Sequence, residues 1–355
     1  MATPHHDADQ GEHLLAQVQA ALKAGMPLCI AGGGSKSFYG REVAGTLLDT
    51  RGHRGIVSYD PAELVVTVRA GTPLAELNAV LDAAGQALPC EAPDFTGSAT
   101  VGGMVAAGLS GPRRPWVGSV RDFVLGCRIV TGQGKHLRFG GQVIKNVAGY
   151  DVSRLMAGSL GCLGLITEVS LKVLPKPRAG VTLRLDQSRA VALRLFAEWG
   201  RQSLPITGVC HDGEATLLRL EGGEGSVRAA RAFLGGEVVS TTFWTNLRDQ
   251  KLDFFSDPRP LWRLSVAAGR LPAELPGDSL ADWGGAQIWL KSAATPEAIR
   301  ALAVAAGGHA ACFTPGVTDS PLAPLPEALL HYHHQLKAQL DPQGIFNPGR
   351  LYAGL

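Results

Sequence analysis

The sequence predicts an α+β protein that is built from two regions. Short apolar runs typical of strands occur between segments whose apolar residues recur at helical spacing. Pro175-Lys176-Pro177 interrupts this pattern and marks a boundary between the two regions. The chain has 355 residues, of which 45% are hydrophobic and 18% are charged, so it is long enough for two domains with substantial cores.

The first region is expected to begin with a helix. Over residues 13–25 apolar side chains recur at helical spacing, and Gly25 stops the pattern. A second helix is expected to start at Thr72-Pro73 and to run to Gly85. The short apolar runs predict strands at residues 27–30, 47–49, 55–58, 64–69, 122–131 and 163–173.

The second region, after Pro177, repeats the alternation on a smaller scale. Strands are expected at residues 181–185, 215–220, 262–266 and 287–291. Helices are expected at residues 190–199, 225–234 and 296–306, the last capped by Thr295. Two β-α-β halves of this kind predict an antiparallel sheet with helices on one face.

A glycine-rich loop follows the strand expected at residues 27–30. In Gly32-Gly33-Gly34-Ser35-Lys36 the successive glycines can adopt positive φ, so that neighbouring N–H groups point into one anion-holding concavity. Ser35 separates Gly34 from Lys36, unlike in a Walker loop, and no helical pattern follows, unlike in a Rossmann fingerprint. Taken alone, the loop also fits a plain surface turn.

Two further segments are rich in small residues. In the segment from Pro93 to Gly108, Thr100 is the expected N-cap of a short helix, and Gly102 and Gly103 give that helix a surface that can lie flat against a ring system. A tightly packed internal helix is the alternative for this segment.

The other segment joins residues 145–151 to a loop with glycine at every third position, Gly158, Gly161 and Gly164, followed by a β-branched run that includes Ile166. Asp151 is a candidate cap for a helix through Met156. Backbone without Cβ atoms can lie directly against a large flat ligand. Together the three segments indicate a cradle for a dinucleotide.

In this order, the three segments resemble the FAD domain of the vanillyl-alcohol-oxidase-like, PCMH-type flavoproteins. More narrowly, the chain resembles the shorter FAD-binding subunits of three-part bacterial glycolate oxidases, including at residues 341–350, where Asn347 would lie near the flavin. The resemblance implies a FAD-binding domain at 1–177 with two subdomains divided near residue 57. It also implies a cap domain at 178–325 and a return of residues 326–355 to the FAD domain.

The resemblance implies non-covalent FAD, oxidation of glycolate to glyoxylate, and partners that include a second FAD-binding subunit and an iron–sulfur subunit. The cofactor-binding residues that it implies are Gly32, Gly33, Gly34, Ser35, Lys36, Pro93, Thr100, Gly102, Gly103, Gly108, Gly158, Gly161, Gly164, Ile166 and Asn347. Two other functions stay open: a scaffold subunit that has lost FAD, and an autonomous flavin oxidoreductase for another hydroxy acid.

Relatives that act on 2-hydroxy acids carry a His-Pro-Gly-Asp-Gly-Asn loop and a Glu-His-Gly segment, which bind a metal and place the base. The present sequence contains neither segment. No catalytic residue is therefore assigned, no metal is expected, and this subunit alone is expected not to oxidise glycolate.

Other candidate residues have plainer interpretations. Asp212-Gly213 is a hairpin signal, which makes His211 a turn residue. The helical pattern around His331, His333 and His334 places the first two on different faces, which indicates a polar helix surface and no metal site. Arg113, Arg114 and Trp116 are compatible with an anionic substrate, a subunit contact or solvated surface.

Composition excludes several classes of function. The net charge of +2 and the lack of a basic stripe argue against a nucleic-acid partner. The sequence contains no run of about 18 apolar residues, so no membrane span is expected. Six scattered cysteines without a Cys-x-x-Cys pair indicate free thiols in a reducing cytosol and no iron–sulfur site. We expect a cytoplasmic protein that reaches the inner membrane only through its partners.

Overall fold

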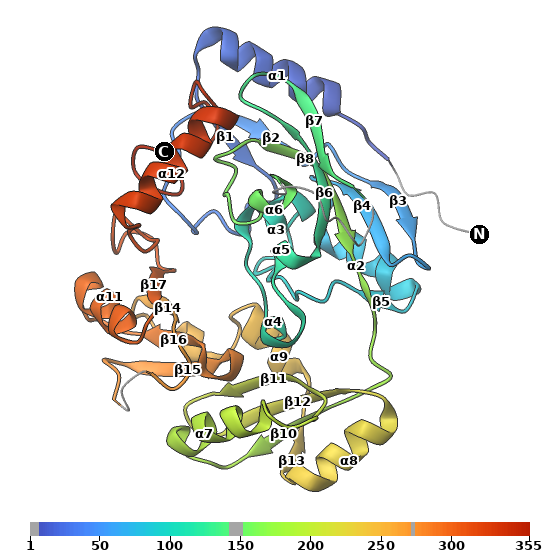
Figure 1. The fold of residues 1–355 in the computed structure, drawn as a ribbon, viewed down its shortest axis with the longest axis vertical. Helices are drawn as coiled ribbons and strands as arrows, with labels where there is room; N and C mark the ends of the chain where they lie inside the picture. Colours follow the sequence, from blue (N-terminus) through green and yellow to red (C-terminus); the bar gives the residue numbers. More distant parts are fainter. Residues whose placement is uncertain (1–6, 142–151, 271–273) are drawn as a thin grey trace. The chain divides into compact units, whose positions relative to one another are not determined.

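The computed structural model describes residues 7–141, 152–270 and 274–355 (Figure 1). The chain divides into two compact units. Unit 1 comprises Met1–Ser110, Gly118–Pro175 and Pro324–Leu355, and unit 2 comprises Gly111–Val117 and Lys176–Ala323. The segment 145–151 and the cap predicted at Asp151 lie outside the described residues.

Unit 1 contains a five-stranded antiparallel sheet in the order β3-β4-β8-β6-β7. The strands are β3 (Ile56–Asp60), β4 (Val65–Arg69), β6 (Val124–Val130), β7 (His136–Gly140) and β8 (Leu165–Lys172). A separate parallel pair consists of β1 (Leu28–Ala31) and β2 (Thr46–Asp49), and a short antiparallel pair of β5 (Gln86–Ala87) and β9 (Leu174–Pro175). The strands expected at residues 27–30, 47–49, 55–58, 64–69 and 163–173 are confirmed within two residues.

Three helices of unit 1 follow the sequence pattern. Helix α1 (Gly11–Ala24) ends at Gly25, whose φ of 63° is left-handed, and its apolar stripe packs against β1 and β2. Helix α2 (Leu74–Ala83) begins one residue after Pro73. Helix α3 (Val101–Ala107) is capped by Thr100, whose Oγ1 accepts a hydrogen bond from the N–H of Gly103 at 3.3 Å.

The strand expected from residue 122 begins later than predicted. Residues of α5 (Val120–Phe123) form a helical turn because the Asp122 carboxylate accepts the backbone N–H of Ser119 at 2.7 Å. β6 therefore starts at Val124. The short helix α6 (Val152–Leu155) and the C-terminal helix α12 (Glu327–Leu340) complete the described helices of unit 1.

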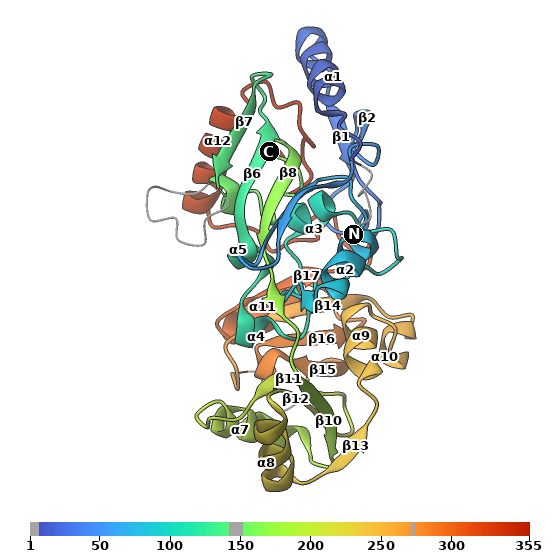
Figure 2. The ribbon, with the colours of Figure 1, turned by 90° about the vertical axis from the view of Figure 1, so that its right-hand side faces the viewer.

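Unit 2 contains an eight-stranded antiparallel sheet in the order β13-β10-β12-β11-β15-β16-β14-β17, visible as one sheet in Figure 2. The strands are β10 (Ala179–Leu185), β11 (Ile206–His211), β12 (Thr216–Gly222), β13 (Glu237–Val239), β14 (Leu261–Ser265), β15 (Asp278–Asp282), β16 (Gln287–Lys291) and β17 (His309–Cys312). The antiparallel arrangement was predicted, whereas β11, β13, β15 and β17 were not.

Helices cover both faces of this sheet, so the prediction of helices on one face was wrong. Helices α7 (Arg189–Trp199) and α8 (Glu224–Leu234) pack against Leu183 and other residues of one face. Successive strand residues point to opposite faces, so Thr182 faces the other way. There Trp244 of α9 (Thr242–Arg248) donates from Nε1 to Thr182 Oγ1 at 2.9 Å.

The remaining helices of unit 2 are α4 (Arg114–Val117), α10 (Asp253–Ser256), the 3-10 helix η1 (Trp283–Gly285) and α11 (Pro296–Ala305). The predicted cap of α11 is confirmed, because Thr295 Oγ1 accepts from the N–H of Ala298 at 3.3 Å. None of the described helices in either unit combines the length and the hydrophobicity that a membrane span requires.

Candidate functional site

The glycine loop after β1 lines a cavity of about 180 Å³ in unit 1. A second cavity of about 80 Å³ adjoins it and shares Ile30, Gly32 and Gly103 among its lining residues. The walls come from the loop after β1, from α3, from the loop before β8 and from the C-terminal turn. Segments that are far apart in the sequence therefore meet at one place.

Most of the residues predicted from the sequence line these two cavities. They are Gly32, Gly33, Gly34, Ser35, Lys36, Thr100, Gly102, Gly103, Gly161, Gly164, Ile166 and Asn347. Pro93, Gly108 and Gly158 line neither cavity. Gly108 ends α3 with a φ of 64°, and a Cβ there would lie 2.9 Å from the Gly158 nitrogen. The absence of a Cβ at Gly108 thus serves the packing of α3 against the loop before β8.

The glycine loop needs its small residues because it lies directly on the segment before α3. A Cβ on Gly33 would overlap the backbone oxygen of Ser98, and the Ser98 hydroxyl donates to Gly33 O at 2.6 Å. Gly34 has a φ of 73°, which residues with a Cβ rarely adopt. The glycines of this loop are therefore required by its close packing on residue 98 and by a left-handed backbone.

The loop offers donors to an anion. Among the described residues, the N–H groups of Gly33, Gly34 and Ser35 have no recorded hydrogen-bond acceptor. The Lys36 ammonium donates to the Ser35 hydroxyl at 3.1 Å and lies 5.5 Å from the centroid of the Phe95 ring. Neighbouring backbone N–H groups beside a cation form a concavity that suits a phosphate.

The C-terminal turn is hydrogen-bonded to the other segments that line the site. Asn347 accepts the N–H of Ile30 on its Oδ1 at 2.7 Å and donates from its Nδ2 to Leu160 O at 2.7 Å. Arg350 donates to the carbonyl oxygens of Ser37 and Arg41, each at 2.8 Å. Burial lowers the pKa of the Arg350 guanidinium. Both side chains connect the C-terminal turn to segments near the start of the chain.

Six further lining residues lie within the segments predicted from the sequence but were not assigned as binding residues, namely Ala31, Ser37, Ala106, Ala107, Leu160 and Arg350. Sequence reasoning missed Cys29, Ile30, Val43, Thr50 and Ala70 altogether. Ala106 could have been found, because it lies three residues after Gly103 and so on the same helix face. Leu160 and Val43 carry no local signal, since their place in the cavity depends on how distant segments pack.

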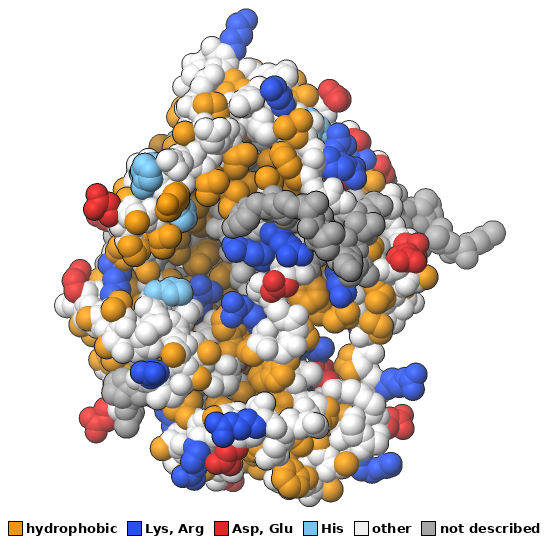
Figure 3. Space-filling view, viewed as in Figure 1, with side chains coloured by type: hydrophobic (Ala, Val, Ile, Leu, Met, Phe, Trp, Pro, Cys, Tyr) orange, Lys and Arg blue, Asp and Glu red, His pale blue; other side chains and the backbone are white. Residues whose placement is uncertain are grey.

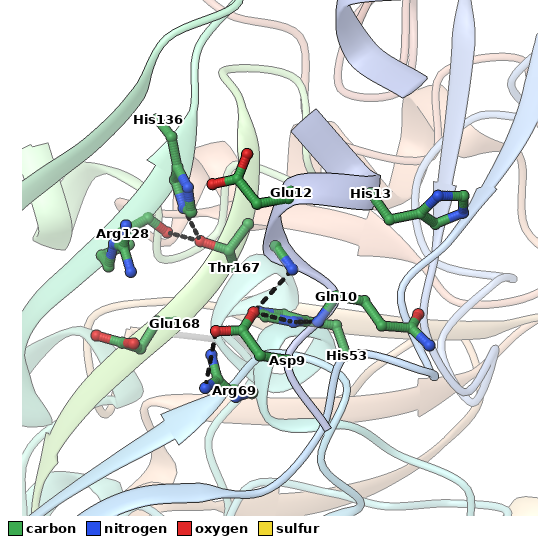
Figure 4. A pocket seen from close by; sticks show the side chains of 11 residues that line it. Asp9, Gln10, Glu12, His13, His53, Arg69, Arg128, His136, Thr167 and Glu168 are labelled. Carbon is green, nitrogen blue, oxygen red and sulfur yellow. Dashed lines mark hydrogen bonds and ion pairs between the residues drawn. The ribbon is translucent and has the colours of Figure 1, made fainter. Parts of the chain in front are cut away.

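A larger cavity in unit 1, of about 430 Å³, contains none of the predicted residues (Figure 4). It lies between the start of α1 and the strands β4, β6, β7 and β8. Figure 4 shows His53, Asp9 and Arg69 turned toward one another. The N–H of Gln10 donates to His53 Nδ1 at 2.9 Å, and Asp9 and Arg69 form an ion pair at 3.0 Å. These polar groups bind one another, so we assign no ligand to this cavity.

The histidines outside these cavities have structural partners. His211 is the buried last residue of β11, not the turn residue that was predicted, and its Nε2 lies 3.0 Å from Gln187 O. The predicted hairpin itself joins β11 to β12. His331, His333 and His334 lie on α12, as expected, where Figure 3 shows histidine and hydrophobic side chains together at the surface. Within the described part of the chain, no group of three or more His, Cys, Asp or Glu residues could hold a metal ion.

Arg113 and Arg114 are held within unit 2. Arg113 forms an ion pair with Glu221, and Arg114 lies 4.5 Å from the ring centroid of Trp283. Trp283 in turn donates from Nε1 to Gly111 O at 3.0 Å. These contacts fix the segment Gly111–Val117, so the two arginines are not simply solvated surface.

The six cysteines are free, as predicted, and all except Cys29 are buried. Burial raises the pKa of the Cys90 thiol to about 12. A thiol with so high a pKa is an inert apolar side chain at neutral pH.

Comparison with known proteins gives consistent matches. Residues 8–140 match the family described as FAD binding domain. The chain is 58% identical over 349 residues to glycolate oxidase subunit GlcE of Escherichia coli (strain K12), covering 98% of this chain and 99% of that protein. It is 35% identical to glycolate oxidase subunit GlcD of Bacillus subtilis (strain 168) over 128 residues, which are 36% of this chain and 27% of that protein.

A solved structure shares the fold. The chain aligns with alkyldihydroxyacetonephosphate synthase at a TM-score of 0.68 and 19% sequence identity, covering 96% of this chain and 74% of the other. This likeness concerns the fold alone, since the sequence identity is low.

Proposed function

Because the chain belongs to the family of glycolate oxidase subunit GlcE, we propose that it is an FAD-binding subunit of a glycolate oxidase that converts glycolate into glyoxylate. The observation that carries this proposal is the convergence of three separate small-residue segments on the two adjoining cavities. Seven of the residues that line them are glycines, and backbone without Cβ atoms can approach a flat ligand closely.

The residues present fit FAD. The loop from Gly32 to Lys36 supplies orphaned N–H groups and a cation for the pyrophosphate. Gly103 and Ala106 on α3 supply surface for a ring system, together with Leu160, whose backbone N–H donates to Ala106 O at 2.9 Å. Bound here, FAD would supply a hydride-accepting ring system, and these residues would orient it and exclude water from it.

We propose that FAD is held without a covalent bond, because the glycines are followed directly by Ser35, Lys36 and Ser37, none of which is a histidine or a cysteine. Denaturation should then release the flavin into solution. Flavin that stays with the precipitated chain would contradict this attachment.

For turnover we propose partners: a second FAD-binding subunit, an iron–sulfur subunit, and through them a membrane acceptor for the electrons. The similarity to GlcE and, over a shorter segment, to GlcD supports a complex of several subunits. The metal-binding and base-carrying segments of relatives that act on 2-hydroxy acids are missing from this sequence. The base for glycolate is therefore proposed to lie in the second flavin subunit.

An anaerobic titration tests this function. Glycolate should bleach the flavin of the complex purified from its native host, and should leave the flavin of the isolated chain oxidised. Bleaching of the isolated chain by glycolate would remove the proposed dependence on a partner. Bleaching by a different hydroxy acid alone would favour an autonomous oxidoreductase, and a chain that never binds FAD would favour a scaffold.

A further inference from the structure

A buried cation lies directly behind the proposed flavin site. Lys337 is only 7% exposed, and it is the one buried residue of α12. Its ammonium group donates three hydrogen bonds, each of 2.7 Å, to Cys162 O, Phe346 O and Asp341 Oδ2. An ammonium group has three N–H donors, so all of them are used.

The carboxylate of Asp341 completes the same arrangement. Asp341 is 1% exposed, and it accepts the N–H groups of Ile345 at 3.1 Å and Phe346 at 2.8 Å. The pair thus shapes the turn that leads into Asn347. Burying two charges is costly, and the cost is offset only when both are paired and fully hydrogen-bonded, as they are here.

The two carbonyl groups that Lys337 binds are next to residues that line the cavities. Cys162 follows Gly161, and Phe346 precedes Asn347. A Cβ on Gly161 would lie 2.6 Å from Asn347 Nδ2, so the two walls are already in contact. Lys337 therefore connects the loop before β8 to the C-terminal turn from the side away from the ligand.

We propose that Lys337, paired with Asp341, is a positioning residue for the flavin site. Without touching the cofactor, it keeps the loop before β8 and Asn347 in the register that the cofactor needs. The inference rests on the proposed binding of FAD at these cavities. Lys337 was not singled out by sequence reasoning, because a lysine on an amphipathic helix ordinarily faces water, and Asp341 was included only as the first residue of the family-like segment 341–350.

Two variants of the full chain separate a positioning role from a merely structural one. K337M leaves an uncompensated carboxylate and two unpaired carbonyl groups. K337M/D341N removes both charges, so it should recover much of the thermal stability that K337M loses, while the link between the two carbonyl groups stays broken. The matched control is L81A, a cavity variant in the buried stripe of α2, which destabilises unit 1 by another route.

The measurement is the rate at which FAD leaves the holoprotein after dilution, followed by the recovery of flavin fluorescence at a temperature at which every variant is folded. We expect at least tenfold faster release from K337M/D341N and little change from L81A. The proposal would be overturned if the double variant released FAD at a rate within twofold of the wild-type rate. It would also be overturned if L81A, at the same melting temperature, released FAD as fast as the double variant does. If the wild-type chain carried no FAD at all, the proposed function would fail first, and that outcome is visible before any variant is compared.

Discussion

At the scale of single residues, the candidate site depends on glycines, which leave space because they have no side chain. Gly103 is exposed on α3, lines both cavities, and has only Thr100 Oγ1, at 3.1 Å, near the position of a Cβ. A larger side chain there would enter the space proposed for the flavin without meeting backbone. Gly103 thus offers a way to fill the site while leaving the rest of the fold intact.

We predict that Gly103→Leu weakens FAD binding at least tenfold, which is about 1.4 kcal/mol, by occupying the cavity. The melting temperature of the FAD-free chain should not fall, because leucine is favoured over glycine in helices by nearly 1 kcal/mol. Flavin fluorescence titration and thermal unfolding measure the two quantities separately.

Gly225→Leu is the matched control for this substitution. Gly225 lies in α8 of unit 2, and no atom lies within 4 Å of the position of a Cβ there. It should change helix stability in the same direction and leave the affinity for FAD unchanged. Equal affinities of the Gly103 variant and wild type would show that α3 does not face the cofactor.

At the scale of elements, the segment before α1 is attached to the sheet of unit 1 by a buried histidine. Ala8 and Arg54 exchange backbone hydrogen bonds, and His53 accepts the N–H of Gln10. Burial is the main cause that lowers the pKa of His53, and Arg69 and His136 lower it further. Asp9 and a backbone hydrogen bond with Thr167 act in the opposite direction. The folded protein therefore favours the neutral imidazole of His53, whose Nδ1 can accept the N–H of Gln10.

A histidine whose pKa is lowered by folding binds fewer protons in the native state than in the unfolded state. Its stabilising contribution is complete above the ordinary pKa of 6.5 and is lost as the pH falls from there through the lowered pKa of the folded state. His136 and His309, whose pKa values are also lowered by burial, add to the same trend.

We predict that the free energy of unfolding decreases on acidification from pH 7.5 to 5.5, and that His53→Asn makes this decrease shallower by up to about 1.4 kcal/mol per pH unit. Asparagine can still accept the N–H of Gln10 but does not titrate. Denaturant unfolding at several pH values provides the curves. Parallel curves for the two proteins would mean that His53 is protonated equally in both states.

Elements with a strong local signal were predictable, and those without one were not. The stripe of α1, its stop at Gly25, and the caps at Thr100 and Thr295 depend on neighbouring residues, and the sequence pattern placed them correctly. β7 is short and carries polar residues, so it shows no apolar run. The pairing of α9 with the second face of its sheet depends on Trp244 meeting Thr182, which are 62 positions apart.

The candidate site shows the same division. Its glycines can be recognised in the sequence, because few other structural features require so many residues without a Cβ. The side chains that connect the walls cannot be recognised in this way. In the sequence, Lys337 and Arg350 resemble ordinary surface cations, and only the fold brings carbonyl groups to them. Local sequence chemistry thus predicts the ligand of the candidate site, whereas long-range packing decides which side chains hold its walls together.

At the scale of the whole molecule, we propose that this FAD-binding chain depends on a partner for its substrate. The similarity to GlcE extends over nearly the full length of both proteins, and so includes unit 2 as well as the flavin-binding part. We predict that mass analysis of the complex from its native host finds this chain with a larger flavoprotein and an iron–sulfur protein. Recovery of the chain alone, in amounts that account for all glycolate oxidation, would contradict that assembly.

The most direct test of the central claim is a flavin count on the purified full-length chain. Released by denaturation, FAD should be found at about one molecule per chain, and added FAD should raise the melting temperature of the stripped protein, as expected for a ligand that binds only the native state. A colourless protein whose melting temperature does not respond to FAD would contradict the account.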